Sequence, residues 1–379
     1  MSKTKSFGFV FLLFLVMRFG LWGWMVFARE IYRGNLSPDP VYRPYMGVEP
    51  VNNVWLEVWQ RWDTLQYQAV AERGYQAFDT AAFTTPLYPF LMQTAGALLG
   101  GNTLIGGIIV SNIFCLAALW AFYLLAEKEL QNVQSAKRAL IYLLIFPASF
   151  FLFAPYTEPL YFLGAAMCVY TLTKKQWIAA GLWGALAAAS RLVGALLIVP
   201  VLWFAWQDWK TDRRWKPWIA PALITLSGIS FPLYVWLGLG KSPLTPFLAQ
   251  SNRFHGGFTL PGISIFLTAK QVWSGIFVPA NSMDLSSTIL FILGVILVWQ
   301  RLPRIYGIYC AAFMLVYLAR YADTYPLLSM TRYVLALFPV FIALPLIDGS
   351  PWIKRLIIYA STLGLLFLSA QFAIWGWVG

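Results

Sequence analysis

Four short stretches of this sequence place charged and aromatic side chains beside long apolar runs. The first, VWQRWDTLQYQAVAERGY at residues 58–75, holds Arg61, Trp62, Asp63 and Tyr67. The others contain Tyr156 and Glu158 in FAPYTEPLY, Ser190 and Arg191 in AAASRLVG, and Arg320, Asp323, Ser329 and Arg332 in ARYADTYPLLSMTRYVLALFP. Because a charge is costly to place in apolar surroundings, several such charges indicate a functional site.

These residue types suit one kind of chemistry. Arginines hold a phosphate group through paired, charge-assisted hydrogen bonds. A neighbouring carboxylate such as Asp63 can take a proton from an attacking hydroxyl group, and apolar walls can hold a lipid chain. The combination favours a reaction in which a lipid-phosphate donor gives its head group to a hydroxyl acceptor.

Composition identifies the setting of these residues. The chain has 379 residues, of which 60% are hydrophobic and 11% charged, whereas soluble domains carry about 25% charged residues. Its apolar runs do not alternate in polarity as the strands of a membrane barrel do, and helices satisfy their own backbone hydrogen bonds in lipid. We therefore predict an all-α, polytopic membrane protein that forms a single domain over residues 1–379.

The apolar runs predict about eleven transmembrane helices. We expect them near residues 7–28, 104–126, 138–154, 156–173, 176–190, 193–207, 217–238, 285–300, 304–320, 330–347 and 352–375. Most basic residues then fall in alternate connections, and only two of the eleven lysines, Lys241 and Lys270, lie on the opposite side. The positive-inside rule makes the lysine-rich side cytoplasmic. The net charge of +12 is thus an orientation signal, and we expect no nucleic-acid partner.

A further apolar stretch at residues 86–101 would invert this orientation if it crossed the membrane. We expect it instead to enter the exterior leaflet and turn back at the Gly100-Gly101-Asn102 break, as a re-entrant or half-spanning segment. The alternative is a twelfth span with the later connections reversed.

Two larger segments then lie outside, residues 29–85 and 238–284. The first carries Asp63, and its pattern around residues 62–75 predicts a short helix in the membrane interface. In the simplest interpretation of that helix, Asp63 only caps it or pairs with Arg61. The second segment is predicted to form a lid or an acceptor platform, or a plain surface loop. Arg18, in the first span, should face the bundle interior and contact either a backbone carbonyl or a lipid phosphate.

The sequence resembles the GPI mannosyltransferase II (PIG-V-like) family of GT-C glycosyltransferases. RWDTLQYQAVAERGY is similar to the family signature R-W-D-x-x-x-Y/F-x-x-I/V-A-x-x-G-Y, and the matches that follow in order are FTTPLYPFL, FPASFFLFAPYTEPLYFL, AAASRLVGALLIVP, PLTPFLAQSNRF and MTRYVLALFPVFIAL. The resemblance runs from about residue 7 to residue 344 and points to a prokaryotic-type member with a GT-C-like fold. It implies that Asp63 is catalytic and that the donor is a polyprenyl-phosphate sugar. No cofactor is certain. A divalent metal stays possible, but no paired acidic motif accompanies Asp63 to support one.

The residues then take the following expected roles in an inverting transfer by single displacement, of a mannosyltransferase-like kind. Asp63 is the general base, and Arg191 and Arg332 hold the leaving phosphate. Substrate hydroxyls or rings are expected to contact the remaining polar and aromatic candidates, which are Arg61, Trp62, Tyr67, Tyr156 and Glu158. The acceptor is a lipid, a glycan or a protein, and a partner subunit stays open.

Two other functions fit the same residues. A transporter or flippase of a lipid-linked substrate would also need arginines near a cavity, although the chain shows no internal repeat relating two halves. A non-catalytic subunit of a transferase complex is the other. In each case we expect a multi-pass membrane protein, in the inner or plasma membrane if the source is prokaryotic. Its site would lie on the non-cytoplasmic face.

Overall fold

The computed structural model describes residues 3–78, 81–253, 255–275 and 279–378. Helices dominate it, as the composition predicts, and its only strands within these ranges are β1 (Gly256–Phe258) and β2 (Arg320–Ala322). The helices of eight residues or more are α1 (Lys3–Ile31), α3 (Asp63–Arg73), α4 (Leu87–Ala97), α5 (Thr103–Leu130), α6 (Val133–Ile145), α7 (Glu158–Leu172), α8 (Trp177–Ser190), α9 (Ile198–Asp212), α10 (Ile219–Leu237), α11 (Thr245–Arg253), α12 (Ile263–Trp273), α13 (Pro279–Arg301), α14 (Arg304–Ala319) and α17 (Pro351–Ala373). Three short helices are α2 (Val54–Glu57), α15 (Met330–Tyr333) and α16 (Pro339–Ala343).

Six helical segments of the described chain are long and apolar enough to cross a membrane. They cover Thr4–Ile31, Thr103–Leu130, Leu192–Asp212, Lys216–Leu237, Asn281–Arg301 and Pro351–Ala373, and two shorter apolar helices cover Trp177–Ser190 and Arg304–Ala319. The expected total of about eleven spans stays a prediction. The span expected near residues 330–347 is not one helix, because it is divided into α15, α16 and short 3-10 turns. Pro339 and Pro345 lie in this region, and proline interrupts a continuous helix.

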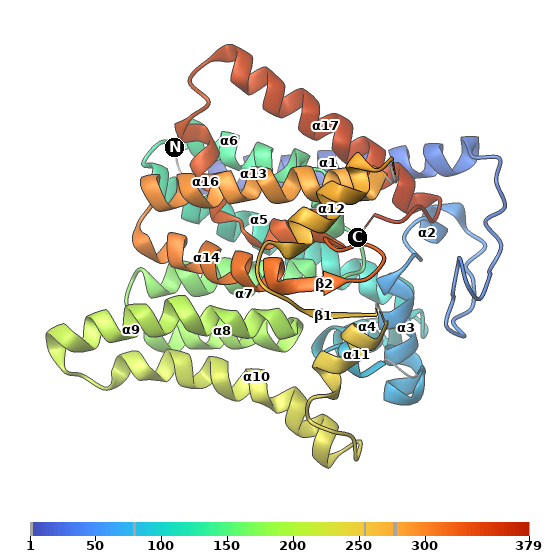
Figure 1. Ribbon diagram of the computed structural model, residues 1–379, viewed down its shortest axis with the longest axis horizontal. Coiled ribbons are helices and arrows are strands. Elements are labelled where there is room, and N and C mark those ends of the chain that lie inside the picture. Colours follow the sequence, from blue (N-terminus) through green and yellow to red (C-terminus); the bar gives the residue numbers. More distant parts are fainter. Residues whose placement is uncertain (1–2, 79–80, 254, 276–278, 379) are drawn as a thin grey trace.

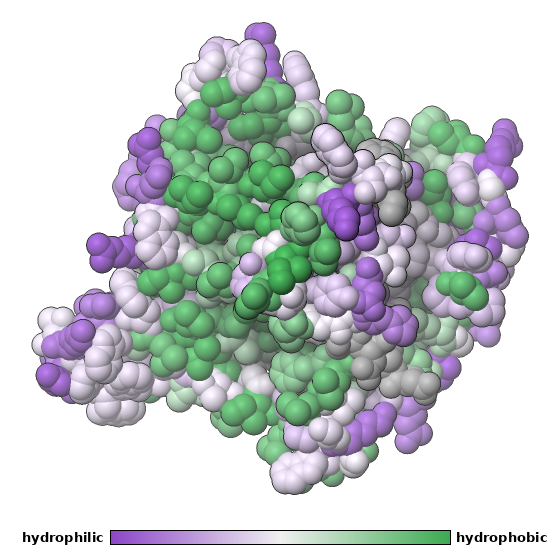
Figure 2. Space-filling model, in the orientation of Figure 1, coloured by the Kyte–Doolittle hydropathy of each residue, from purple (hydrophilic) through white to green (hydrophobic). Residues whose placement is uncertain are grey.

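The bundle has two distinct ends. In Figure 1 most long helices run across the view, with the N-terminus and the α9–α10 turn at the left and α3, α4, β1 and β2 at the right. Hydrophobic side chains cover much of the middle of the face in Figure 2, and hydrophilic ones gather toward the left and right ends. The basic α9–α10 connection thus lies at the end of the bundle opposite to α3, as the charge pattern predicts.

The stretch expected to be half-spanning forms α4. Its eleven residues extend about 16 Å at ~1.5 Å per residue, which is too short for a hydrocarbon core of about 30 Å. The chain turns after it through Gly100 and Gly101, which have positive φ, and Asn102 caps α5. At the other end of α4, the Tyr88 hydroxyl contacts Ser111 in α5 at 2.8 Å. Hence α4 packs along the outer part of α5.

The helix expected in the membrane interface is α3, but it does not lie on the surface. Its residues from Thr64 to Ala71 are all buried, and α3 packs against α4 and α5. The amphipathic pattern predicted the helix correctly, whereas its burial follows from α4, which covers it. The helix therefore holds Asp63, its first residue, against the interior of the bundle.

The segment that contains α11, β1 and α12 is attached to the chain beside α14. Strand β1 pairs antiparallel with β2 in the register Gly256 with Ala322 and Phe258 with Arg320. The pairing is extended by a backbone hydrogen bond of 2.7 Å from Thr259 N to Ala319 O. Helices α11 and α12 flank this two-stranded sheet, so the segment covers one side of the region where α14 ends.

Candidate functional site

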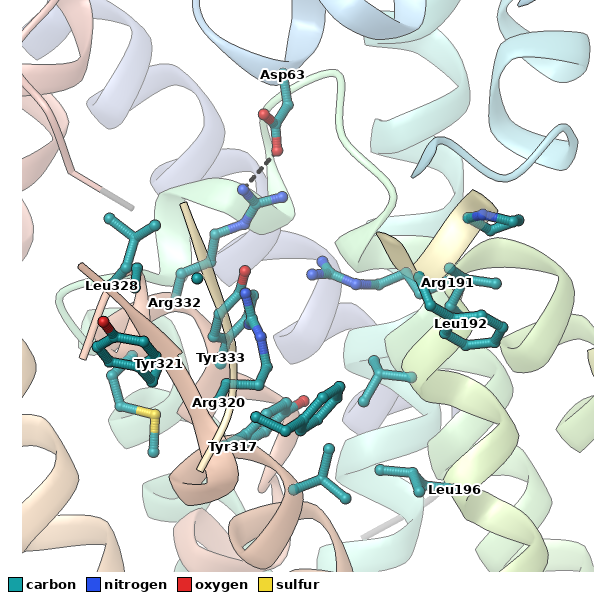
Figure 3. A pocket seen from close by; sticks show the side chains of 18 of the residues that line it. Asp63, Arg191, Leu192, Leu196, Tyr317, Arg320, Tyr321, Leu328, Arg332 and Tyr333 are labelled. Carbon is teal, nitrogen blue, oxygen red and sulfur yellow. Dashed lines mark hydrogen bonds and ion pairs between the residues drawn. The ribbon is translucent and has the colours of Figure 1, made fainter. Parts of the chain in front are cut away.

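A cavity of about 290 Å³ opens where the four polar stretches of the sequence meet. Its charged lining consists of Asp63 from the start of α3, Arg191 after α8, Arg320 at the start of β2 and Arg332 in α15. In Figure 3 Arg191 and Arg332 extend from different sides into the space below Asp63. Segments more than 250 residues apart in the chain therefore build one site.

Arg332 is the central cation of this site. Its Nη1 donates to Asp63 Oδ2 at 2.6 Å, and its Nε donates to Glu158 Oε1. The guanidinium also lies over the rings of Phe151 and Tyr156, 4.8 and 4.7 Å from their centroids. One fork-shaped side chain thus fixes two carboxylates that come from α3 and α7.

Glu158 has a second arginine partner. Its carboxylate, which is 6% exposed, accepts from Arg191 as well as from Arg332. Burial alone would lower the pKa of Arg191, but the facing Glu158 carboxylate outweighs it and holds that pKa above its usual value. Glu158 is therefore a structural anion that holds both arginines in place, and its other oxygen, Oε2, has no hydrogen-bond partner among the described residues.

Asp63 is held through its backbone and its side chain. Its N–H donates to the Tyr156 hydroxyl at 3.1 Å, and its Oδ1 accepts from the Gln66 amide at 3.1 Å. The preceding residue, Trp62, has φ 51° and ψ −118°, a sparsely populated backbone conformation that costs an L-residue about 1–3 kcal/mol. This bend turns the carboxylate toward Arg332, and 22% of it stays exposed.

Hydroxyl groups line the cavity beside Asp63. The Tyr67 hydroxyl contacts Thr157 Oγ1 at 3.3 Å, and burial together with the nearby Asp63 and Glu158 carboxylates raises the pKa of Tyr67, which keeps its proton. Thr85 donates to the backbone oxygen of Ser190 at 2.7 Å. Its neighbour Thr84 is buried and also lines the cavity, but its hydroxyl has no partner among the described residues.

Arg320 differs from the other two arginines of the cavity. No carboxylate of the described chain lies within ion-pair distance of it, and its guanidinium lies over the ring of Tyr333, 4.5 Å from the centroid. Arg191, Arg320 and Arg332 face only Asp63 and Glu158, so three positive and two negative charges leave a formal charge of +1. The site is therefore suited to an anion.

Four of the residues expected to contact substrate lie outside the cavity lining: Arg61, Trp62, Tyr156 and Glu158. Arg61 is fully buried and bonds Glu57 at 2.7 Å, and its Nε donates to Ala373 O at 3.1 Å. Trp62 packs against Trp375 and Trp377. Their side chains point away from Asp63 because consecutive residues at the start of a helix face different directions. Tyr156 is also buried outside the lining, where it supports Asp63 and Arg332.

Other residues of the lining were not predicted as site residues. Tyr317 and Tyr333 stack at 5.3 Å and an angle of 19°, and Thr84 and Thr85 belong to the FTTPLY match. Their position beside a proline in that match could have identified Thr84 and Thr85 as site residues. No sequence pattern indicated the stacked tyrosines.

The described residues include no group of three or more His, Cys, Asp or Glu side chains that could hold a metal ion. The two carboxylates nearest the cavity, Asp63 and Glu158, both bind Arg332. These two carboxylates are therefore occupied by ion pairs with arginine, and we assign no metal ligand.

Comparison with known proteins places the chain in a family. A family model described as mannosyltransferase (PIG-V) matches residues 16–207. GPI mannosyltransferase 2 from two strains of Cryptococcus neoformans var. neoformans serotype D is 31% identical over 197 residues, which cover 46% of this chain and 46% of the relative. The matched region thus spans about half the length of these relatives.

A solved structure shares the fold. The crystal structure of ArnT from Cupriavidus metallidurans bound to undecaprenyl phosphate aligns with a TM-score of 0.53 and 14% identity, over 92% of this chain and 62% of that chain. This similarity confirms the GT-C-like fold expected from the sequence. Because the family model also covers half of the chain, the chain belongs to the mannosyltransferase (PIG-V) family.

Proposed function

We propose that the protein is an inverting glycosyltransferase that moves a sugar from a polyprenyl-phosphate donor to a hydroxyl acceptor. The observation that carries this proposal is the position of Asp63 at a cavity with excess positive charge. A proton acceptor and an anion site are the two groups that such a transfer requires. The fungal relatives are named GPI mannosyltransferase 2, which supports mannose as the sugar.

The geometry suggests how the donor is bound. Arg320 has no carboxylate partner among the described residues, so the phosphate would bind first to Arg320 and then to Arg332, where it would displace Asp63. Leu192 and Leu196 form part of an apolar wall on the Arg191 side of the cavity (Figure 3), where the first prenyl units would lie. The undecaprenyl phosphate bound to the solved ArnT structure supports a lipid phosphate of this class.

Arrival of the phosphate would also prepare Asp63. In the structure Oδ2 of the Asp63 carboxylate is occupied by its ion pair with Arg332. A phosphate oxygen competes for the same guanidinium and releases the carboxylate. Asp63 then takes the acceptor proton as the acceptor oxygen bonds to the anomeric carbon. The bond from that carbon to the phosphate oxygen breaks, and the polyprenyl phosphate leaves with the bonding electrons to Arg320 and Arg332.

We place this reaction on the exterior face of the membrane. Supporting this, the basic α9–α10 connection lies at one end of the bundle and α3 at the other (Figure 1). By the positive-inside rule the basic end faces the cytoplasm, so Asp63 would face outward.

The first experiment measures donor consumption by the purified chain in nanodiscs. A panel of radiolabelled polyprenyl-phosphate sugars is supplied with membrane-lipid extract to wild type, Asp63→Asn and, as a matched control, Asp212→Asn at the opposite end of the bundle. We expect Asp63→Asn to reduce turnover about 10²–10⁴-fold and Asp212→Asn to retain it. Absence of turnover in a well-folded wild type with every donor would favour a transporter or a subunit that needs a partner.

A further inference from the structure

Two tryptophans with unusual backbone conformations meet next to Asp63. Trp62 has φ 51° and Trp375, just after α17, has φ 66°. Few L-residues have a positive φ, and such a backbone persists only where the surroundings enforce it. The rings of these two residues pack edge to face with centroids 5.4 Å apart, and the ring of Trp377 packs on Trp62 from 5.0 Å.

The residue before Trp62 is attached to the same segment. Arg61 donates from Nε to Ala373 O at 3.1 Å, and its guanidinium lies over the ring of Trp375, 5.1 Å from the centroid. The segment 373–377 is itself fixed, because Trp375 N bonds Phe372 O at 3.2 Å and Gly376 N bonds Gln371 O at 2.7 Å. Both residues that precede Asp63 are thus held by one segment more than 300 positions away.

This segment lies outside the cavity. Neither Trp375 nor Trp377 is among the residues that line it, and Trp375 is 7% exposed while packing with Tyr45 at 5.4 Å. A substrate in the cavity therefore does not touch these rings. Any effect that they have on the reaction must pass through Arg61 and Trp62 to the carboxylate.

We infer that the segment 373–377, through Trp375 and Trp377, is a positioning element that fixes Asp63 toward the cavity. The inference rests on the proposed function for the role of Asp63. Without the two rings, Trp62 relaxes to a right-handed or extended backbone and the start of α3 rotates. Asp63 then loses its direction toward Arg332 while the cavity and its arginines stay in place. A displacement of about 1 Å at a reacting group can reduce a rate about 100-fold.

The experiment compares Trp375→Ala, Trp377→Ala and the conservative Trp375→Phe and Trp377→Phe. The control is Trp24→Ala, which removes another tryptophan contact to α17, the 2.8 Å hydrogen bond from Trp24 Nε1 to Leu366 O. We expect the alanine variants to lower kcat about 10- to 100-fold with the donor KM changed less than about twofold. The phenylalanine variants should restore most of the rate, and Trp24→Ala should keep it.

A second measurement does not depend on turnover. Amide hydrogen exchange of residues 60–65 should become faster in the alanine variants and stay unchanged in Trp24→Ala. Unchanged kcat and unchanged exchange in both alanine variants would overturn the inference and leave the proposed function intact. A raised KM at constant kcat would also overturn it, because that result indicates lost binding. If the wild type consumes no donor, the proposed function fails, and the exchange result alone decides whether the segment holds Asp63.

Discussion

Arg332 and Asp63 form an ion pair of 2.6 Å across 269 positions of the chain. The arginine is 6% exposed and the aspartate 22%. The pair joins the start of α3 to α15, which follows β2. Because Arg332 also binds Glu158, its planar guanidinium connects the carboxylate that we propose to react with a structural one.

Arg332→Lys should therefore impair the reaction strongly. An ammonium group cannot hold two carboxylates in the geometry of a guanidinium fork, so Asp63 and Glu158 lose their common partner. We expect kcat/KM for the donor to fall about 100-fold, as is typical when one electrostatic donor of an active site is removed. Steady-state kinetics with Arg355→Lys as the control would check this. Normal kinetics for Arg332→Lys would show that the ion pair is not needed.

Arg320→Gln should weaken donor binding more than it slows the chemical step. This variant removes the arginine that has no carboxylate partner and the excess positive charge of the cavity. Loss of a hydrogen bond to a charged group costs about 1.5–3 kcal/mol, which corresponds to roughly 10- to 100-fold in the Kd. Titration with polyprenyl phosphate alone measures this effect without turnover. An equal loss in Arg191→Gln, with Arg320→Gln unchanged, would assign the phosphate to Arg191 instead.

Arg191→Met should destabilise the fold by a similar amount across the working pH range. The pKa of Arg191 is higher in the folded protein than in the unfolded chain. Its contribution is therefore complete below the unfolded pKa and is lost only as pH rises through the folded value. Between about pH 7 and pH 10 the loss should stay near 1–3 kcal/mol, since Arg332 still neutralises Glu158. Thermal unfolding at several pH values measures it, and a loss that vanishes at pH 10 would contradict this assignment.

Thr84→Val should alter recognition of the sugar without affecting the phosphate. The Thr84 hydroxyl is buried at the cavity and has no partner in the described chain, and valine keeps the shape of the side chain. A lost hydrogen bond to substrate costs about 0.5–1.5 kcal/mol. We expect kcat/KM to fall about 2- to 10-fold and binding of polyprenyl phosphate alone to be unchanged. Thr84→Ser, which keeps the hydroxyl, is the matched control, and equal kinetics of the two variants would remove Thr84 from the sugar site.

The sequence predicted the general architecture because membrane insertion imposes strong patterns. Long apolar runs, basic connections and the Gly100-Gly101 break correspond to the helices and to the turn after α4. Arg18 bonds the backbone oxygen of Phe153 at 2.9 Å, one of the two contacts expected for it. Each of these features follows from local composition.

The details of the site depend on contacts between distant segments. No local pattern shows that Arg61 and Trp62 turn toward residues 373–377, because the rings that Trp62 packs against, Trp375 and Trp377, are more than 300 positions away. Likewise, the pairing of β1 with β2 involves three residues on each side, too few for a period-2 pattern. Arg320 becomes a member of the site only through that pairing and the end of α14.

The short sheet has a consequence for the lifetime of a complex. Phe258 lies opposite Arg320, and a side chain at Gly256 would overlap the carbonyl oxygen of Tyr321. Strand β1, whose three residues line the cavity, is therefore bound through main-chain hydrogen bonds to β2, the strand that carries Arg320. An anion held by Arg320 would stabilise β2, and β2 would hold β1 over the cavity. The lipid could then leave only after β1 and β2 separate. Residence time, more than affinity, would then be set by these six residues.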